Sequence, residues 1–148
     1  MSTISQIQRN RERPVPKPEW RKKVLLVCDA PLCKVLSRWL EAEGYECRLA
    51  TSCSTARETL RHERFAALMA EYDTMHELTA RLLELARLQY PDTRVFLITT
   101  LEQFVAGGRA MDPGADGYLF VPLHRGEVVT SVNALLDDDD STARSEDG

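Results

Sequence analysis

The chain has 148 residues, of which 43% are apolar and 28% charged, and its formal net charge is −4. This length and composition fit one ordinary globular domain. No apolar run approaches the about 20 residues that cross a bilayer, and the first residues lack the apolar stretch of a secretory signal. We therefore exclude a membrane protein and expect a cytoplasmic one, with all four cysteines as reduced thiols: Cys28, Cys33, Cys47 and Cys53.

The charges are unevenly distributed along the chain. Residues 1–23 contain seven basic and two acidic residues, whereas residues 137–148 contain one basic and six acidic residues. Neither end is rich enough in apolar residues to bury a core. We predict a flexible basic tail over residues 1–22, a folded domain over 23–136 and an acidic disordered tail over 137–148. The basic tail could contact nucleic-acid phosphates, but the acidic domain favours a solubilising role, so a nucleic-acid partner is not expected.

Short apolar runs alternate with helical patterns in the central part of the chain. The predicted strands cover residues 24–28, 46–50, 65–70, 94–99 and 117–121, and four of these runs are nearly continuously apolar, as in strands covered on both faces. Apolar residues at three- and four-residue spacing predict helices over 32–43, 54–62, 76–89, 103–111 and 126–136. Pro31 suits the first turn of the first helix, Gly44 its end, and Ser54 the N-cap of the second.

Five repeats of a strand followed by a helix predict an α/β fold with a five-stranded parallel sheet and helices on both faces. In such folds the functional site lies at the carboxyl ends of the strands. The polar and unusual residues expected at that edge are Cys28, Asp29, Glu71, Tyr72, Asp73, Thr99, Thr100, Val121 and Pro122.

The motifs at these strand ends resemble the receiver domain of two-component response regulators, over essentially all of residues 23–136. The run VLLVCDAP looks like the family's first strand, which ends in an acidic pair and a proline. VFLITT resembles its fourth strand, ending in Thr, and GADGYLFVP its fifth strand, where an aromatic residue precedes a Lys-Pro pair. The resemblance implies the (βα)5 flavodoxin-like receiver fold, a role in phosphorelay signalling and a cis bond before Pro122.

The resemblance also assigns roles to single positions. In the family, two acids and an acceptor Asp hold Mg²⁺, a hydroxyl and a Lys bind the phosphoryl group, and an aromatic residue moves with the switch. The matching positions are Cys28 and Asp29 for the acidic pocket, Glu71 for the acceptor, Thr99 and Tyr118 for the switch, and Val121 before Pro122 for the Lys-Pro pair.

Three of these positions are altered, at Cys28, Glu71 and Val121. A thiol is a poor ligand for Mg²⁺, so Asp29 and Glu71 alone would make a thin metal site, and no cofactor is expected. The extra methylene of Glu71 displaces its carboxylate, and Val121, read as a packed apolar residue, removes the cation that would pair with an acyl phosphate. We therefore do not expect conventional aspartyl phosphorylation. A further hypothesis is that Glu71 imitates a phosphoaspartate by reaching toward Thr99; the simpler alternative is two solvated carboxylates at the strand rim.

We predict a stand-alone, non-enzymatic, receiver-like signalling protein. Its partner would be a kinase, an output protein or a second copy of the chain, and the expected interaction face comprises the fourth helix, Tyr118, and Val128, Val129 and Val132 of the last helix. One alternative is a phosphoaccepting response regulator that uses Glu71 or Asp73. The other is a thiol-based redox sensor at Cys28, set against cysteines that are only small buried residues.

Overall fold

The computed structural model describes residues 19–107 and 115–147. Within that range, the side chains of residues 72–80, 106–107 and 137–147 lie outside the description. The five strands are β1 (Lys23–Val27), β2 (Glu46–Ala50), β3 (Ala67–Glu71), β4 (Arg94–Thr99) and β5 (Gly117–Phe120). The helices are η1 (Glu19–Lys22), α2 (Ala30–Glu41), α3 (Cys53–His62), α4 (Tyr72–Gln89), α5 (Leu101–Gly107) and α6 (Arg125–Asp147).

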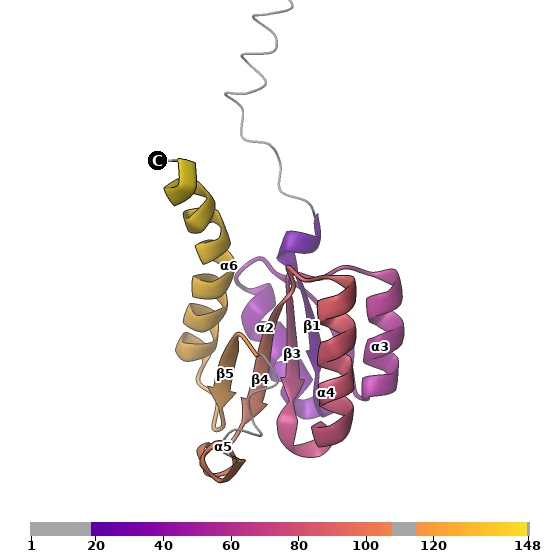
Figure 1. The fold of residues 1–148 in the computed structure, drawn as a ribbon. Coiled ribbons are helices and arrows are strands. Elements are labelled where there is room, and N and C mark those ends of the chain that lie inside the picture. Colours follow the sequence, from indigo (N-terminus) through magenta and orange to yellow (C-terminus); the bar gives the residue numbers. More distant parts are fainter. Residues whose placement is uncertain (1–18, 108–114, 148) are drawn as a thin grey trace, which may run out of the picture.

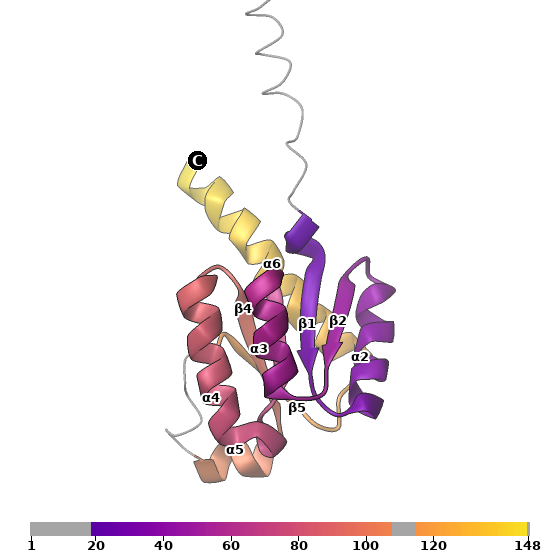
Figure 2. The same ribbon diagram turned by 90° about the vertical axis from the view of Figure 1, so that its right-hand side faces the viewer.

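The strands form one parallel sheet in the order β2-β1-β3-β4-β5. The predicted fold class is therefore confirmed, including helices on both faces of the sheet (Figures 1 and 2). Helices α2 and α6 pack on one face, where Leu36 and Val128 belong to the same core cluster. Helices α3 and α4 pack on the other face, where Leu60 and Leu82 share a second cluster. Burial on both sides explains why the central strands are continuously apolar.

Several element boundaries differ from the predictions. Strand β3 begins two residues later than expected, at Ala67, and α4 begins four residues earlier, at Tyr72. The N-cap of α3 is Ser52, whose side chain accepts a hydrogen bond from the backbone N–H of Thr55, and not Ser54. Gly44 has a φ of +94°, the left-handed conformation that follows the end of α2. These differences shift no strand out of the sheet and leave the strand ends where a site was expected.

The two ends of the domain also bear on the predictions. Residues 1–18 of the expected basic tail lie outside the described residues, while residues 19–22 form η1. The ring of Trp20 lies 3.8 Å from the guanidinium carbon of Arg64, a cation–π contact that holds η1 against the domain. Helix α6 continues to Asp147, where a disordered tail was predicted from residue 137. No Pro or Gly interrupts residues 137–147, and an established helix extends one residue at a time at little cost.

Within the described part of the chain, no helix combines the length and the apolar character that a membrane crossing requires.

Candidate functional site

The carboxyl edge of the sheet brings together Asp29, after β1, and Glu71, at the end of β3. Asp29 is the N-cap of α2: its Oδ1 accepts a hydrogen bond of 2.8 Å from the backbone N–H of Leu32. The backbone N–H of Asp29 in turn donates to Glu71 Oε1 at 3.3 Å. The predicted proximity of these two acids is therefore present, but one oxygen of each carboxylate is engaged with a backbone N–H.

This arrangement bears on the expected metal site. Mg²⁺ requires near-octahedral coordination by oxygen atoms, usually from one or two carboxylates together with waters and substrate phosphates. Among the residues that the structure describes, no three His, Cys, Asp or Glu side chains are grouped so that they could hold a metal ion. Two carboxylates that each give an oxygen to the backbone, beside a thiol at Cys28, are a poor donor set for Mg²⁺.

Cys28 lies behind this edge and contacts a second thiol. It is fully buried, and its Sγ lies 2.8 Å from the Sγ of Cys33, which is 1% exposed in the first turns of α2. The Cys33 thiol also lies 3.5 Å from the carbonyl oxygen of Cys28. The hydrogen bond between the two thiols, together with burial, raises the pKa of Cys28, whereas the same hydrogen bond lowers the pKa of Cys33. We refer to Cys28 and Cys33 as the dithiol pair.

Thr99 and Tyr118, the two predicted switch residues, have separate surroundings. Thr99 is buried at the end of β4, and its hydroxyl donates to Gln103 Oε1 in α5 at 3.2 Å. The ring of Tyr118 meets the ring of Phe104 edge-on, with 4.9 Å between the ring centroids. Phe104 also packs edge-on against Phe120, at 5.4 Å. We call Phe104, Tyr118 and Phe120 the aromatic cluster; it joins α5 to β5.

The segment after β5 differs from one expectation. Val121 is 38% exposed and is not a packed core residue. β5 is the edge strand of the sheet and ends at Phe120, so Val121 lies just beyond the strand at the margin of the sheet. The backbone N–H of Val121 donates to the carbonyl of Thr99 at 2.9 Å, and the Val121–Pro122 bond is cis, as the resemblance implies.

The predicted interaction face on α6 must be corrected. Val128 and Val132 are fully buried in the core beneath the sheet, so they are not available to a partner, and Val129 is only half-buried. Residues four apart lie on the same side of a helix, and on α6 this apolar side faces the sheet. The accessible side of α6 therefore carries other residues.

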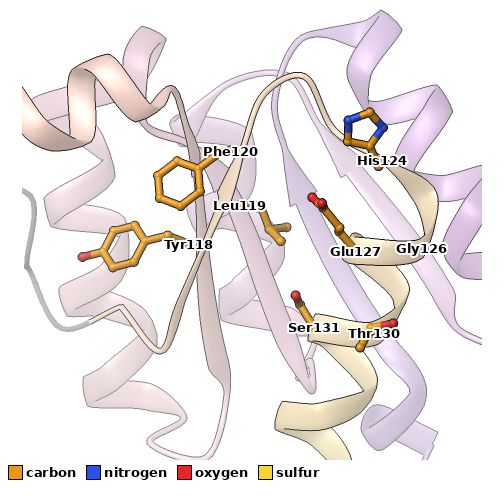
Figure 3. Close-up of a pocket in the computed structure, with 8 residues that line it drawn as sticks. All are labelled: Tyr118, Leu119, Phe120, His124, Gly126, Glu127, Thr130 and Ser131. Carbon is orange, nitrogen blue, oxygen red and sulfur yellow. The ribbon is translucent and has the colours of Figure 1, made fainter.

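Those residues line a groove between β5 and α6, with a volume of about 620 Å³. Figure 3 shows Tyr118 and Phe120 on one side of β5, with Leu119 on the other side, toward α6. The residues that line the groove are Tyr118, Leu119, Phe120, His124, Gly126, Glu127, Thr130 and Ser131. Of these, only Tyr118 was singled out from the sequence; for Glu127, Thr130 and Ser131, the polar positions of the amphipathic pattern in α6 were the available signal.

Helix α5 adds exposed apolar side chains next to the aromatic cluster. Leu101 is 61% exposed and Val105 is 70% exposed, although both are large apolar residues. Phe104, from the same helix, packs inward against Tyr118 and Phe120. Exposed apolar groups of this kind are typical of surfaces that bind other proteins when they occur together. Leu101, Val105, Val121 and the groove form what we call the β5 face.

Comparisons with known proteins place the fold. No family model matches the sequence, and no curated protein matches it. Among solved structures, the chain is similar to a CheY-like response regulator receiver domain protein from Methanospirillum hungatei, with a TM-score of 0.68 and 23% identity over 82% of this chain and 98% of that one. It is also similar to the receiver domain of the Francisella response regulator 1452, with a TM-score of 0.68 and 20% identity over 80% and 98% of the two chains.

A third similar structure is the chemotaxis response regulator CheY4 of Vibrio cholerae, with a TM-score of 0.66 and 22% identity over 76% of this chain and 97% of that one. The chain thus has the CheY-like flavodoxin fold, and it covers nearly the full length of each of these three structures. At these identities the likeness establishes the fold alone.

Proposed function

We propose that this chain is a receiver-like signalling protein that acts by binding another protein through the β5 face, without phosphorylation of an aspartate. The observation that carries the proposal is the exposure of Leu101 and Val105 on α5, the helix whose Phe104 packs against Tyr118 of β5, together with the exposure of Val121 just after β5. When a partner covers exposed apolar side chains, the free energy of the system falls, which favours binding. The partner is a signalling protein, either a kinase or an output protein.

The carboxyl edge supports the second half of the proposal. The acceptor position holds Glu71, one of whose carboxylate oxygens, Oε1, accepts a hydrogen bond from the Asp29 backbone N–H. The position that would supply a cation holds Val121, which offers an acyl phosphate no electrostatic partner. The third altered position holds Cys28, whose thiol contacts the thiol of Cys33.

The same contacts weigh against Glu71 as an imitation of phosphoaspartate. That hypothesis requires the Glu71 carboxylate to engage the Thr99 hydroxyl. In the structure, Glu71 Oε1 accepts from Asp29, and the Thr99 hydroxyl donates to Gln103. We therefore favour a domain in which the residues at the carboxyl edge of the sheet stabilise the fold. Binding at the β5 face then does not depend on phosphorylation.

The test is incubation of the chain with acetyl phosphate and Mg²⁺, followed by intact mass measurement. We expect no phosphoryl adduct on the wild-type chain. The double variant Glu71→Asp with Val121→Lys serves as the matched comparison, because it restores the acceptor and the cation while leaving the dithiol pair in place. A stoichiometric, hydroxylamine-labile adduct on the wild-type chain would overturn the proposal and favour a phosphoaccepting regulator.

That alternative names Glu71 or Asp73 as the acceptor. Glu71 is half-buried at the strand end, while the side chain of Asp73 lies outside the described residues. Fragment mass spectrometry of any adduct identifies which of the two carries the phosphoryl group. Adduct on neither residue, in a chain that stays folded, is the result that our proposal requires.

A second copy of the chain is also a candidate partner for the β5 face. Light scattering after size-exclusion chromatography measures this directly. If the chain is a dimer, the double variant Leu101→Ser with Val105→Ser should convert it to a monomer, because both side chains are exposed in the described chain and would be covered in the dimer. The control is Val35→Ser, which changes an exposed residue of α2 outside the β5 face and should leave the dimer intact.

A further inference from the structure

The dithiol pair has a geometry that an ordinary pair of buried cysteines lacks. A disulfide requires its sulfur atoms at about 2.0 Å, and the Sγ atoms of Cys28 and Cys33 lie 2.8 Å apart. A shift of less than about 1 Å, shared by two side chains, would bring the sulfurs to bonding distance. Cys28 follows strand β1, and Cys33 lies in α2, so the pair joins the sheet to the helix across the loop that carries Asp29.

The structure also indicates how an oxidant would reach these thiols. Both are essentially excluded from water, at 0% and 1% exposure. The chain that joins them is at the surface, because Asp29, Ala30 and Pro31 are all exposed. Helix ends open more readily than helix centres. The hydrogen bond that the Leu32 N–H donates to Asp29 Oδ1 helps to hold this turn, and opening of the turn would be the route of an oxidant to Cys33.

We propose that Cys28 and Cys33 form a redox-sensitive site, which a hydroperoxide converts from a dithiol to an intramolecular disulfide. This modification would operate on the loop between β1 and α2 and is independent of the partner that the β5 face binds. In the oxidised form, the ring closed by residues 28–33 would fix the first turn of α2, together with Asp29, against the end of β1.

The chemistry proceeds in two balanced steps. The thiolate of Cys33 attacks one oxygen of hydrogen peroxide; the O–O bond breaks, the other oxygen leaves and is protonated to water, and Cys33 becomes a sulfenic acid. The thiol of Cys28 then attacks that sulfur, the S–O bond breaks, and a second water carries away the remaining proton. The two cysteines lose two electrons in total, and the peroxide is reduced to two molecules of water.

The test uses the full chain and needs no variant. After exposure to hydrogen peroxide, the chain is quenched in acid, unfolded and alkylated with N-ethylmaleimide, then cleaved with trypsin. Cleavage after Lys23 and Lys34 places both members of the pair in one peptide, residues 24–34, while Cys47 falls in residues 39–48 and Cys53 in residues 49–57. The disulfide therefore appears as the loss of two hydrogen atoms within a single peptide.

We expect peptide 24–34 to lose two hydrogens and to resist alkylation after peroxide, and to take up two maleimides again after treatment with dithiothreitol. The peptides with Cys47 and Cys53 should stay reduced and therefore be alkylated in every sample. For Cys47 the reason is that burial raises its pKa to about 12, and a neutral thiol reacts slowly with peroxide. Two maleimides on peptide 24–34 after peroxide would overturn the proposal. So would a sulfinic acid on it without a disulfide, or a disulfide that joins it to another peptide.

Two variants refine the result. Cys33→Ser should stop the reaction, leaving peptide 24–34 without an internal disulfide, whereas Cys47→Ser should leave the oxidation unchanged. As a second measurement on the wild-type chain, amide hydrogen exchange in residues 29–33 should slow on oxidation, because the disulfide restrains the turn whose opening exposes these amides. Unchanged or faster exchange would contradict the proposed fixing of the loop.

Discussion

The centre of the sheet and its β5 edge use similar residues for opposite purposes. In β1, β3 and β4, apolar side chains are buried on both faces, and the groups at the strand ends bond to neighbouring parts of the chain, as Glu71 does to Asp29. Around β5, apolar side chains of the same size are left in water, at Leu101, Val105 and Val121. The difference teaches that the central part of this fold buries its apolar side chains for stability, while the β5 face leaves comparable side chains in water, where our proposal places the binding of a partner.

The largest effect should come from removing a central side chain. Leu97 of β4 is fully buried between α4 and its neighbouring strands, so Leu97→Ala should lower the free energy of unfolding by about 3 kcal/mol. Leu101→Ala, on the exposed β5 face, should change it by less than about 0.5 kcal/mol. Urea denaturation of both variants measures the contrast; similar losses in the two would remove the distinction between the regions.

Two glycines near β5 should respond in opposite directions. A Cβ at Gly117 would lie 3.1 Å from the ring of Phe96, so Gly117→Val should cost about 2 kcal/mol through overpacking. A Cβ at Gly126, in the first turn of α6, meets nothing within 4 Å, so Gly126→Ala should stabilise the chain by about 0.5 kcal/mol. Thermal denaturation of the Gly117→Val and Gly126→Ala variants measures both changes in stability. A destabilising Gly126→Ala would mean that the groove side of α6 is more tightly constrained than its contacts indicate.

The role of Asp29 can be separated into cap and charge. Asp29→Ala removes the hydrogen bond to the Leu32 N–H and should cost about 1 kcal/mol, whereas Asp29→Asn keeps an N-capping oxygen and should cost much less. Chemical denaturation of the two variants provides the comparison. If Asp29→Asn lowers the free energy of unfolding as much as Asp29→Ala, the negative charge of Asp29 matters. Asp29 would then not act only as a helix cap.

The smallest effect concerns the other end of the central strands. Glu63 accepts from Lys23 at 2.9 Å and pairs with Arg48, and these contacts lower the pKa of its carboxyl below the usual value. A lowered folded-state pKa gives stability that is present above the unfolded pKa and lost as the pH falls through the folded pKa. Because Glu63 is partly exposed, we expect this contribution to be below about 1 kcal/mol.

This prediction is tested with Glu63→Gln, compared with the wild type by urea denaturation at neutral pH and at successively lower pH. The two curves should differ at neutral pH and converge in acid, as the wild-type carboxylate is protonated. Glu46→Gln is the matched control, since Glu46 lies 3.9 Å from the same Lys23 and is two-thirds exposed. A difference between wild type and Glu63→Gln that persists undiminished in acid would show that charge is not its cause.

The architecture was predictable because its signals are local. Apolar runs and helical spacing set the elements in order, and each of the five strands appears within a few residues of its expected place. The start of α4 was missed because the predicted apolar face was traced only from Leu78, although Tyr72 and Met75 continue the same spacing, and Glu71 offers no side-chain cap to mark the start. Ser52 and Ser54 are equivalent as sequence signals, and only the geometry of the turn selects Ser52 as the cap of α3.

The site was less predictable because it depends on contacts between distant segments. The approach of Asp29 and Glu71 followed from the topology, but the backbone hydrogen bond that joins them did not. Val128 and Val132 were assigned to the surface although the same apolar pattern predicts burial, and the structure corrects this. The 2.8 Å contact of the dithiol pair depends on side-chain rotamers at the junction of a strand and a helix, which no sequence pattern specifies.

The anchoring of η1 through Trp20 and Arg64 has a practical consequence for handling the molecule. It fixes the start of the described chain at the amino ends of the strands, and α6 projects beyond the sheet toward that same pole (Figure 1). An affinity tag, a fluorophore or a sensor surface attached next to Glu19 or to Asp147 would therefore load one pole of the domain. The opposite pole, which carries the dithiol pair and helix α5, would face away from the support.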